Sequence, residues 1–400
     1  MPMRMRIPPV DQYRGDVSTT PKTTAPTRVG VVGGGQLARM MGEVSHDVHV
    51  SVTVLATSAD DSATDSCDHY VIGAAQDPTA LEALAALVDV VTFDHELVDL
   101  DQILALEAAG VVVRPSAHAL HFSVDKAHQR VEFARAGLPV PRFVTTRSSR
   151  DSATERFVDE VGQVVVKAAR GGYDGRGVLF PVDRAEALTM IDDLARTGEV
   201  VVEERLSLLA EFAQVVARGH DASCVAYPLV RTVQRDGMCV EVTFPADVEG
   251  ATSAEAERIA RGIAELIGAV GIVAVEFFLT ERGLVVNEIA SRPHNSGHWT
   301  IEGAATSQFA NHLLAVSGAP LGAATAIVRA AAMVNVVGAE TPGSIEAAAR
   351  VPGAHVHDYG KTWRPGRKLG HVTVVGDDLA AAHVTAWESA RTYGTSTQEA

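Results

Sequence analysis

The chain has 400 residues, more than a single hydrophobic core usually serves, so we expect two or three domains. Its composition is that of an ordinary soluble protein, with 46% apolar and 21% charged residues and no apolar run long enough to span a bilayer. A net charge of −16 argues against nucleic acid as a partner, because nucleic-acid-binding proteins normally carry a basic face. Anionic substrates must then be bound by local groups of basic residues.

The termini and cysteines indicate a cytoplasmic protein. Cys67, Cys224 and Cys239 lack the spacing of a metal site or a redox pair, which suits a reducing compartment. Residues 1–26 are rich in proline, threonine and basic groups and have no apolar segment of a secretory signal. We expect them to be a disordered extension.

The first third of the ordered chain alternates between strands and helices. We predict strands at 28–32, 50–55, 88–93 and 111–113, and helices at 36–45 and 78–87. This alternation is typical of a parallel, doubly wound sheet.

The rest of the chain has fewer helices. We predict helices at 126–137, 254–267, 304–316 and 379–391, and strands at 163–168, 199–204, 211–218, 223–230, 238–244, 272–279, 283–289 and 331–337, with a β-like tail at 356–375.

The hairpin 272–289 places two carboxylates opposite each other. If it is centred near Arg282, Glu276 and Glu288 are cross-strand partners with Cβ atoms ~4.5–5.5 Å apart, where like charges are destabilising. A divalent cation would offset this repulsion, and Mg²⁺ typically binds one or two carboxylates plus substrate phosphates. The alternative is a pair of solvated strand carboxylates.

Two glycine-rich turns follow predicted strands. Residues 33–38 match a dinucleotide fingerprint that ends in alanine, but the acids Asp60 and Asp61 come late for a ribose. A phosphate or nucleotide monophosphate, NAD and a purely structural turn remain alternatives. In the second turn, Lys167 precedes four glycines within 171–177; this is a flap for oxyanions or else a long hairpin turn, and it is not a Walker loop.

Three further groups of polar residues could contribute to a site. Glu203, Glu204 and Glu211 follow an apolar strand, where they could contact a nucleoside or be solvated surface acids. Four cations in eight residues of the tail could bind phosphate or form a solvated turn: Lys361, Arg364, Arg367 and Lys368. The third group is Arg292, His294, Asn295 and His298. The two histidines alone could suggest zinc, but Pro293 and Gly297 disfavour the helix of a metalloprotease. A substrate-anchoring loop beside the metal is therefore favoured.

Together these elements resemble the ATP-grasp ligases, and within them the N5-carboxyaminoimidazole ribonucleotide synthases. The resemblance runs from Arg28 to about His371. It rests most on Gly-Gly-Gln-Leu-Ala-Arg-Met at 34–40, Gly-Gly-Tyr-Asp-Gly-Arg-Gly at 171–177, Asn-Glu-Ile-Ala-Ser-Arg-Pro-His-Asn-Ser-Gly-His-Trp at 287–299 and Arg-Pro-Gly-Arg-Lys-Leu-Gly-His at 364–371. Two positions depart from the family pattern: Lys126 stands where some relatives carry arginine, and Asp94 where a glutamate is usual.

The resemblance implies an α/β protein with the ATP-grasp fold. A Rossmann-like, doubly wound domain would occupy residues 27–122, the small lid domain 123–205, and the large domain with a C-terminal substrate-binding segment 206–400.

The family pattern also implies the site residues. ATP would be bound by Lys126, Lys167, Gly172, Tyr173, Asp174, Gly175, Arg176, Gly177, Val178, Glu203, Glu204, Arg205, Leu206, Glu211, Gln234, Asn287 and Glu288, with Mg²⁺ or Mn²⁺ on Glu276 and Glu288. The aminoimidazole ribonucleotide would be bound by Gly34, Gly35, Gln36, Leu37, Glu96, Arg292, His294, Asn295, Lys361, Arg364, Arg367 and Lys368. Catalytic roles would fall to Arg292, His294, Tyr173 and Lys361.

The implied reaction is ATP-dependent carboxylation of 5-aminoimidazole ribonucleotide by bicarbonate through carboxyphosphate, in a homodimer with no nucleic-acid or membrane partner. The alternatives are another ATP-grasp enzyme, such as a formate-dependent glycinamide ribonucleotide ligase or a biotin-dependent carboxylase subunit, and a non-catalytic nucleotide-binding regulator.

Overall fold

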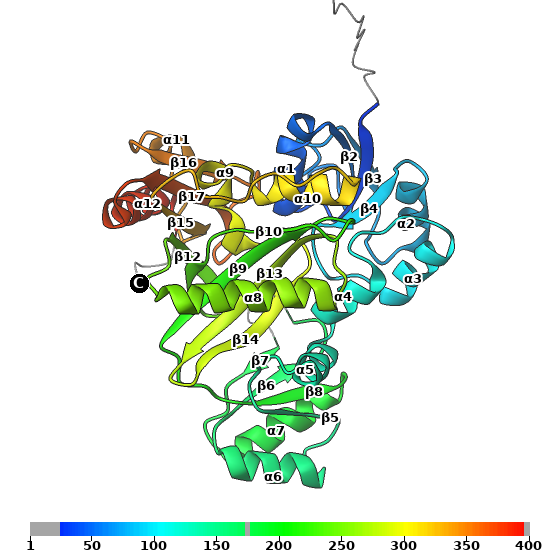
Figure 1. The fold of residues 1–400 in the computed structure, drawn as a ribbon, viewed down its shortest axis with the longest axis vertical. Coiled ribbons are helices and arrows are strands. Elements are labelled where there is room, and N and C mark those ends of the chain that lie inside the picture. The colour runs from blue at the N-terminus through cyan, green and yellow to red at the C-terminus, as the bar shows by residue number, and fades with distance from the viewer. Residues whose placement is uncertain (1–24, 173–176, 396–400) are drawn as a thin grey trace, which may run out of the picture.

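The computed structural model describes residues 25–172 and 177–395 (Figure 1). Most of the expected N-terminal extension lies outside these ranges, as do the loop residues Tyr173, Asp174, Gly175 and Arg176. The described chain forms three sheets, of four, four and nine strands. Across these ranges, no helix combines the length and the apolar character needed to cross a membrane.

The N-terminal sheet is parallel, as the alternation of strands and helices predicts. Its order is β3 (His69–Ile72), β2 (Val50–Ala56), β1 (Thr27–Val32) and β4 (Val90–Phe93). Separate buried clusters on its two faces involve α1 (Gln36–Val44) on one side and α2 (Pro78–Ala85) and α3 (Leu100–Ala108) on the other; the short helix η1 is His46–Val48. The predicted strand at 111–113 is wrong, since only Val113 forms an isolated bridge, with Val91.

Two helices, α4 (Ala117–Val124) and α5 (Lys126–Arg135), lead into the second sheet, at the lower end of Figure 1. Its antiparallel order is β5 (Phe143–Thr146), β8 (Val200–Glu204), β6 (Val164–Ala168) and β7 (Val178–Leu179). Helices α6 (Ser152–Val161) and α7 (Arg184–Ala195), which the sequence analysis did not predict, pack their apolar residues against this sheet. We call residues 143–204 the lid.

The third sheet is antiparallel and continues into the C-terminal part of the chain. Its order is β14 (Gly283–Ala290), β13 (Gly271–Thr280), β9 (Ala210–Arg218), β11 (Val230–Arg235), β12 (Met238–Phe244), β15 (Ala330–Val337), β17 (Lys368–Gly376) and β16 (Ala354–Asp358), with β10 (Cys224–Ala226) also paired to β9. The single strand predicted at 223–230 is therefore wrong, because its two ends belong to different strands.

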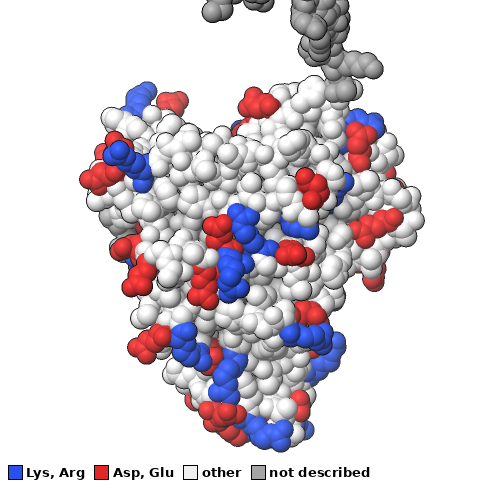
Figure 2. Space-filling view, in the orientation of Figure 1, with Lys and Arg blue, Asp and Glu red and all other residues white. Residues whose placement is uncertain are grey.

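Helices cover both faces of this large sheet: α8 (Gly250–Leu266), α9 (Thr300–Gly303), α10 (Gln308–Ser317), α11 (Ile345–Ala348) and α12 (Leu379–Tyr393), with the short η2 (Asn295–Gly297). The helix predicted from 304 begins at Gln308, because Ala304 forms a bridge with Ala326 and the Ser307 side chain caps α10 by accepting from Ala310 N. On the face seen in Figure 2, basic and acidic side chains are interspersed.

The alternation of side chains along β13 decides where the functional face lies. Val273, Val275 and Phe277 are buried in one cluster with Ile259 and Ile263 of α8. Because successive side chains of a strand point to opposite faces, Glu276 points away from α8.

Candidate active site

A cavity of about 1120 Å³ lies between the N-terminal sheet, the start of α5 and the large sheet. Residues more than three hundred positions apart in the sequence meet in its wall. The predicted site residues that line it are Gly34, Gly35, Gln36, Leu37, Glu96, Lys126, Gly172, Gln234, Glu276, Glu288, Arg292, His294, Asn295, Lys361, Arg367 and Lys368.

Other predicted residues lie outside this lining. Asn287 is one contact away, since its side-chain nitrogen bonds Glu276 of the wall, and Lys167 Nζ in turn donates to the Asn287 side-chain oxygen. Arg364 is exposed on the basic turn. The remainder of this group is Gly177, Val178, Glu203, Glu204, Arg205, Leu206 and Glu211.

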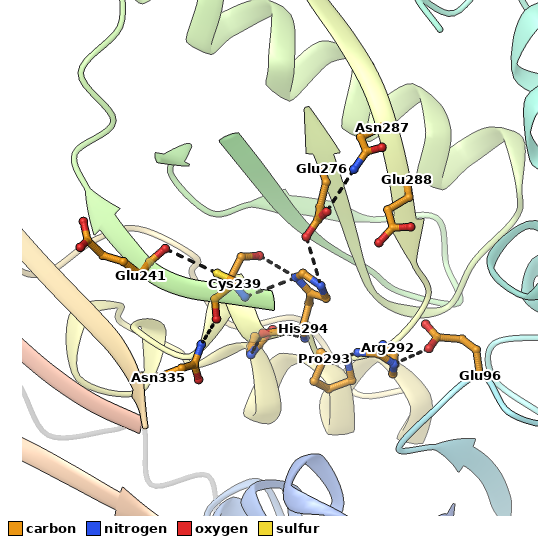
Figure 3. Close-up of polar contacts among 12 residues, drawn as sticks. Glu96, Cys239, Glu241, Glu276, Asn287, Glu288, Arg292, Pro293, His294 and Asn335 are labelled. Carbon is orange, nitrogen blue, oxygen red and sulfur yellow. Dashed lines mark hydrogen bonds and ion pairs between the residues drawn. The ribbon is translucent and has the colours of Figure 1, made fainter. Parts of the chain in front are cut away.

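Glu276 and Glu288 are direct cross-strand partners, as the hairpin prediction required (Figure 3). A β-bulge produces this alignment. From the turn, Thr280 pairs with Gly283 and Phe277 with Val286, and the register then shifts so that Glu276 meets Glu288 and Asn287 has no partner. Without the extra residue, Glu276 would face an amide instead of a carboxylate.

The two carboxyl groups differ in their ionisation. Burial, with the negative charges of Glu288 and Glu211, raises the pKa of Glu276 to about 8. Lys126 Nζ lies 2.6 Å from Glu288 Oε2 and holds the pKa of Glu288 well below its usual range. The Glu288 side chain remains 43% exposed, toward the cavity. The site therefore has one carboxylate neutralised by lysine and one carboxyl group that no cation pairs with among the described residues.

This donor set fits a cation that takes its remaining ligands from a substrate. Among the residues that the structure describes, no three His, Cys, Asp or Glu side chains are grouped to hold a metal by themselves. Two facing carboxylates open to a large cavity suit Mg²⁺, which keeps waters and binds phosphate oxygens.

A second buried ionic cluster lies beside the carboxylates. Lys167 Nζ is 2.8 Å from Glu203 Oε2, and Arg130 Nε is 2.5 Å from Glu203 Oε1. Both oxygens of Glu203 are thus occupied, so a nucleoside passing this strand would meet its backbone rather than its carboxylate. Burial is the main cause that lowers the pKa of Lys167, whereas the two cations lower the pKa of Glu203 to about 2.

Another part of the cavity wall joins three distant segments. Arg292 Nε donates to Glu96 Oε2 at 2.6 Å, and Lys361 Nζ donates to Gln36 Oε1 at 2.6 Å. The other oxygen of Glu96 is buried without a hydrogen-bond partner in the described chain. A ligand with a donor group would satisfy it.

The first glycine turn is filled by a carboxylate. Gly35 N donates to Asp94 Oδ2 at 2.6 Å and Ala38 N to Asp94 Oδ1 at 3.1 Å. A Cβ at position 35 would lie 2.3 Å from that carboxylate. Because Asp94 occupies these amides at the start of α1, they do not form the pyrophosphate cradle of an NAD site.

His294 is held neutral and in one tautomer. Burial and the charge of Arg292 lower the pKa of His294 to about 3. Its Nδ1 accepts from the backbone N–H of Ser296 at 3.3 Å, which assigns the ring proton to Nε2, 3.6 Å from Glu276 Oε1. His298 is fully buried instead, bonded to Gln308 and stacked on His371. The two histidines therefore have separate roles.

Sequence reasoning missed two residues that hold the site together. Gln308 accepts from His294 N at 2.9 Å and donates to His294 O at 2.7 Å, but a glutamine at a helix start gives no sequence signal of this. For Arg130 the sequence contains a usable signal, because Arg130 follows Lys126 by four positions on a helix and therefore lies on the same face.

Comparison with known proteins supports one family along the whole chain. Residues 27–123 match a ribonucleotide synthetase preATP-grasp domain, residues 131–309 an ATP-grasp domain, and residues 331–385 a phosphoribosylaminoimidazole carboxylase C-terminal domain. The N5-carboxyaminoimidazole ribonucleotide synthase of Mycobacterium tuberculosis is 45% identical over 377 residues, which cover 91% of this chain and 87% of the relative. That of Corynebacterium ammoniagenes is 38% identical, covering 93% and 94%.

Solved structures agree with the sequence comparison. The N5-carboxyaminoimidazole ribonucleotide synthetase from Thermus thermophilus matches with a TM-score of 0.84 at 34% identity, covering 93% of this chain and 100% of that chain. An Aspergillus clavatus N5-carboxyaminoimidazole synthase in complex with ADP and 5-aminoimidazole ribonucleotide matches with a TM-score of 0.84 at 29% identity, covering 92% and 99%. The chain therefore belongs to the N5-carboxyaminoimidazole ribonucleotide synthase family of ATP-grasp ligases.

Proposed function

We propose that this protein uses ATP and bicarbonate to carboxylate the exocyclic amine of 5-aminoimidazole ribonucleotide, with release of ADP and phosphate. The observation that carries the proposal is the cavity, whose wall contains two polar groups: the facing carboxylates Glu276 and Glu288 with Lys126, and Arg292 with Lys361. We assign the first group to one end of the site, for a nucleoside triphosphate with its metal, and the second to the other end, for an anionic acceptor.

At the first end, the side chains neutralise and orient phosphates. Lys126 and Lys167 lie beside the carboxylate pair, and Mg²⁺ or Mn²⁺ bound by Glu276 and Glu288 would neutralise charge on the transferred phosphoryl group. Positioning and charge neutralisation are the main contributions of proteins to such transfers. We also propose that the other residues which the family pattern implies for ATP binding contact the nucleotide.

At the second end, the side chains hold bicarbonate and the ribonucleotide. We assign Arg292, fixed by Glu96, to the bicarbonate, and Lys361 with the basic turn to the ribonucleotide. His294 is neutral beside Glu276, and we assign it to the proton that leaves the attacking amine.

Carboxyphosphate decomposes in water, so the site needs to exclude solvent while it exists. As the family pattern implies, we propose that the glycine-rich segment 171–177, of which residues 173–176 lie outside the described ranges, closes over the phosphates and that Tyr173 covers the reacting centre. We further propose a cytoplasmic homodimer with domains over residues 27–122, 123–205 and 206–400.

Omission of substrates tests the activity. Phosphate release from MgATP should require both bicarbonate and 5-aminoimidazole ribonucleotide, and leaving out either should reduce it to background. Release that depends on formate or biotin would instead support another ATP-grasp enzyme, and release that needs no acceptor would refute the proposal.

The Glu288→Gln variant tests the metal assignment. We expect turnover to fall by at least about a hundredfold, because the amide loses the charge that a metal-bound phosphoryl transfer requires. Circular dichroism should be unchanged, since Glu288 opens to the cavity rather than to the core. Near-normal turnover over a Mg²⁺ titration would contradict the assignment.

A further inference from the structure

Arg130 is a buried cation that the proposed mechanism does not use. Its side chain is 2% exposed, and it is absent from the cavity lining. It lies one turn after Lys126 on α5, and both side chains extend toward the carboxylate hairpin.

The guanidinium joins the lid to the hairpin. Nε pairs with Glu203 of β8, and a terminal nitrogen donates to the backbone carbonyl of Asn287. Asn287 is the extra residue of the bulge, in a strand at the edge of the sheet. The neighbouring Val286 N donates to Pro139 O at 2.7 Å, so this edge is contacted at the bulge and at the residue before it. The ion pair with Glu203 and the hydrogen bond to Asn287 hold the guanidinium in place.

A count of charges shows what the fixed cation does. Lys126 and Glu288 neutralise each other, which leaves Arg130, Lys167 and Glu203 as two cations on one buried carboxylate. Each cation takes one oxygen of Glu203. An arginine does not lose its proton in a protein, so the cluster holds one uncompensated positive charge. Buried charges are costly without a partner, and of the two cations the Lys167 side chain is the more exposed, at 10% against 2% for Arg130. Its Nζ also donates to the side-chain oxygen of Asn287, whose side-chain nitrogen bonds Glu276 in the cavity wall.

We propose that Arg130 is a positioning residue that shares Glu203 with Lys167. The cluster of these three residues thereby keeps a net positive charge, and Lys167 presents that charge to the phosphate chain of ATP. If Arg130 were neutral, Glu203 would neutralise Lys167 and the cluster would attract no anion. This inference rests on the proposed use of ATP, and it assigns to Arg130 no contact with the nucleotide.

Three variants test the balance of charge. Arg130→Met should raise KM for ATP, and the Kd of MgATP measured by calorimetry, roughly tenfold or more, the scale of one charge-assisted hydrogen bond. KM for the ribonucleotide and for bicarbonate should stay within about twofold of the native enzyme. Arg130→Lys keeps the charge and should remain within about threefold of the native Kd.

The decisive variant combines Arg130→Met with Glu203→Gln. It removes one charge of each sign and leaves Lys167 as the net cation, so MgATP affinity should return to within about threefold of native. Arg184→Met is the matched control, because it breaks an exposed arginine–carboxylate pair with Asp159 on the same lid. Thermal melting of each variant shows whether it folds.

Two results would overturn the inference: native MgATP affinity in Arg130→Met, or a double variant that binds MgATP as weakly as Arg130→Met alone. If the unaltered enzyme released phosphate without needing the ribonucleotide, the proposed function would fail instead, while the calorimetric comparison would still decide the role of Arg130. If Arg130→Met does not fold, the double variant and Arg130→Lys must both bind MgATP near the native affinity for the inference to survive.

Discussion

Glu276 makes the metal-free protein sensitive to alkaline conditions. Burial and the neighbouring carboxylates raise its pKa in the folded protein to about 8, above its ordinary value of 4.5. Between these values the folded state binds a proton that the unfolded state has lost, so the free energy of unfolding decreases as pH rises. Ionisation of Glu276 therefore lowers the stability of the folded protein, which indicates that this group serves the site and not the fold.

We therefore expect the melting temperature of the metal-free protein to fall between about pH 5 and pH 8, the interval between the two pKa values, and Mg²⁺ with ADP to stabilise it most at the upper end. Glu276→Gln should flatten this dependence. Differential scanning fluorimetry at constant ionic strength measures it. A native profile that stays flat without metal, or a variant that keeps the slope, would contradict this origin.

At the residue scale, the sequence predicted groups whose signal was local. Glu276 and Glu288 were predicted to pair and they do, although the register set by the turn 280–283 would by itself place Asn287 opposite Glu276. The bulge at Asn287 was not predicted, since nothing in 284–289 distinguishes a bulged strand from a regular one. Arg130 was missed because one arginine on a polar helix is typical of a solvated surface.

At the scale of elements, the start of α5 positions Lys126. The side chain of Asp125 accepts from Ala127 N and His128 N, both at 3.0 Å, and this cap places Lys126 at the first helical position. Helix α12 begins in the same way, with Asp378 accepting from Ala380 N and Ala381 N, but far from the cavity. The two helices offer a controlled comparison of stability with function.

Asp125→Ala should lower the free energy of unfolding by about 1–2 kcal/mol, the usual effect of losing a helix cap, and should raise KM for ATP severalfold because the first turn of α5 loosens. Asp378→Ala should cost a similar amount of stability and leave KM unchanged. Urea denaturation and steady-state kinetics measure the two effects. Equal changes of KM in both variants would show that Lys126 does not depend on its cap.

Prediction of elements succeeded where periodicity was strong and failed where tertiary contacts decide. The parallel strands β1, β2 and β4 are short apolar runs between helices, and all three were predicted. Strand β3, by contrast, reads His-Tyr-Val-Ile with mostly exposed side chains, and it is a strand because its backbone pairs with β2. The order of the nine-stranded sheet also lay beyond the sequence, since pairing such as that of β12 with β15 is fixed by long-range packing.

At the scale of the whole molecule, the C-terminal segment completes the large sheet. Strand β15 pairs with β12 on one side and with β17 on the other, and all eight of its residues are buried. Removing it would leave β12 as an unpaired apolar edge, with Val240 and Val242 uncovered.

A chain that ends at residue 329 should therefore aggregate when expressed under conditions in which the full chain stays in solution. Size-exclusion chromatography and sedimentation of lysates compare the two. A monomeric truncated chain with a cooperative melt would show that the first 329 residues fold independently of the C-terminal strands.

The contact between Gln36 and Lys361 spans nearly the entire chain and has a consequence for synthesis. During translation, the segment that carries Glu276 and Glu288 leaves the ribosome well before Lys361 does. The contact between the two segments can therefore form only after Lys361 has been translated, more than three hundred residues after Gln36. Until then the N-terminal sheet lacks one of the polar contacts that tie it to the basic turn, so this wall of the cavity is completed late in synthesis.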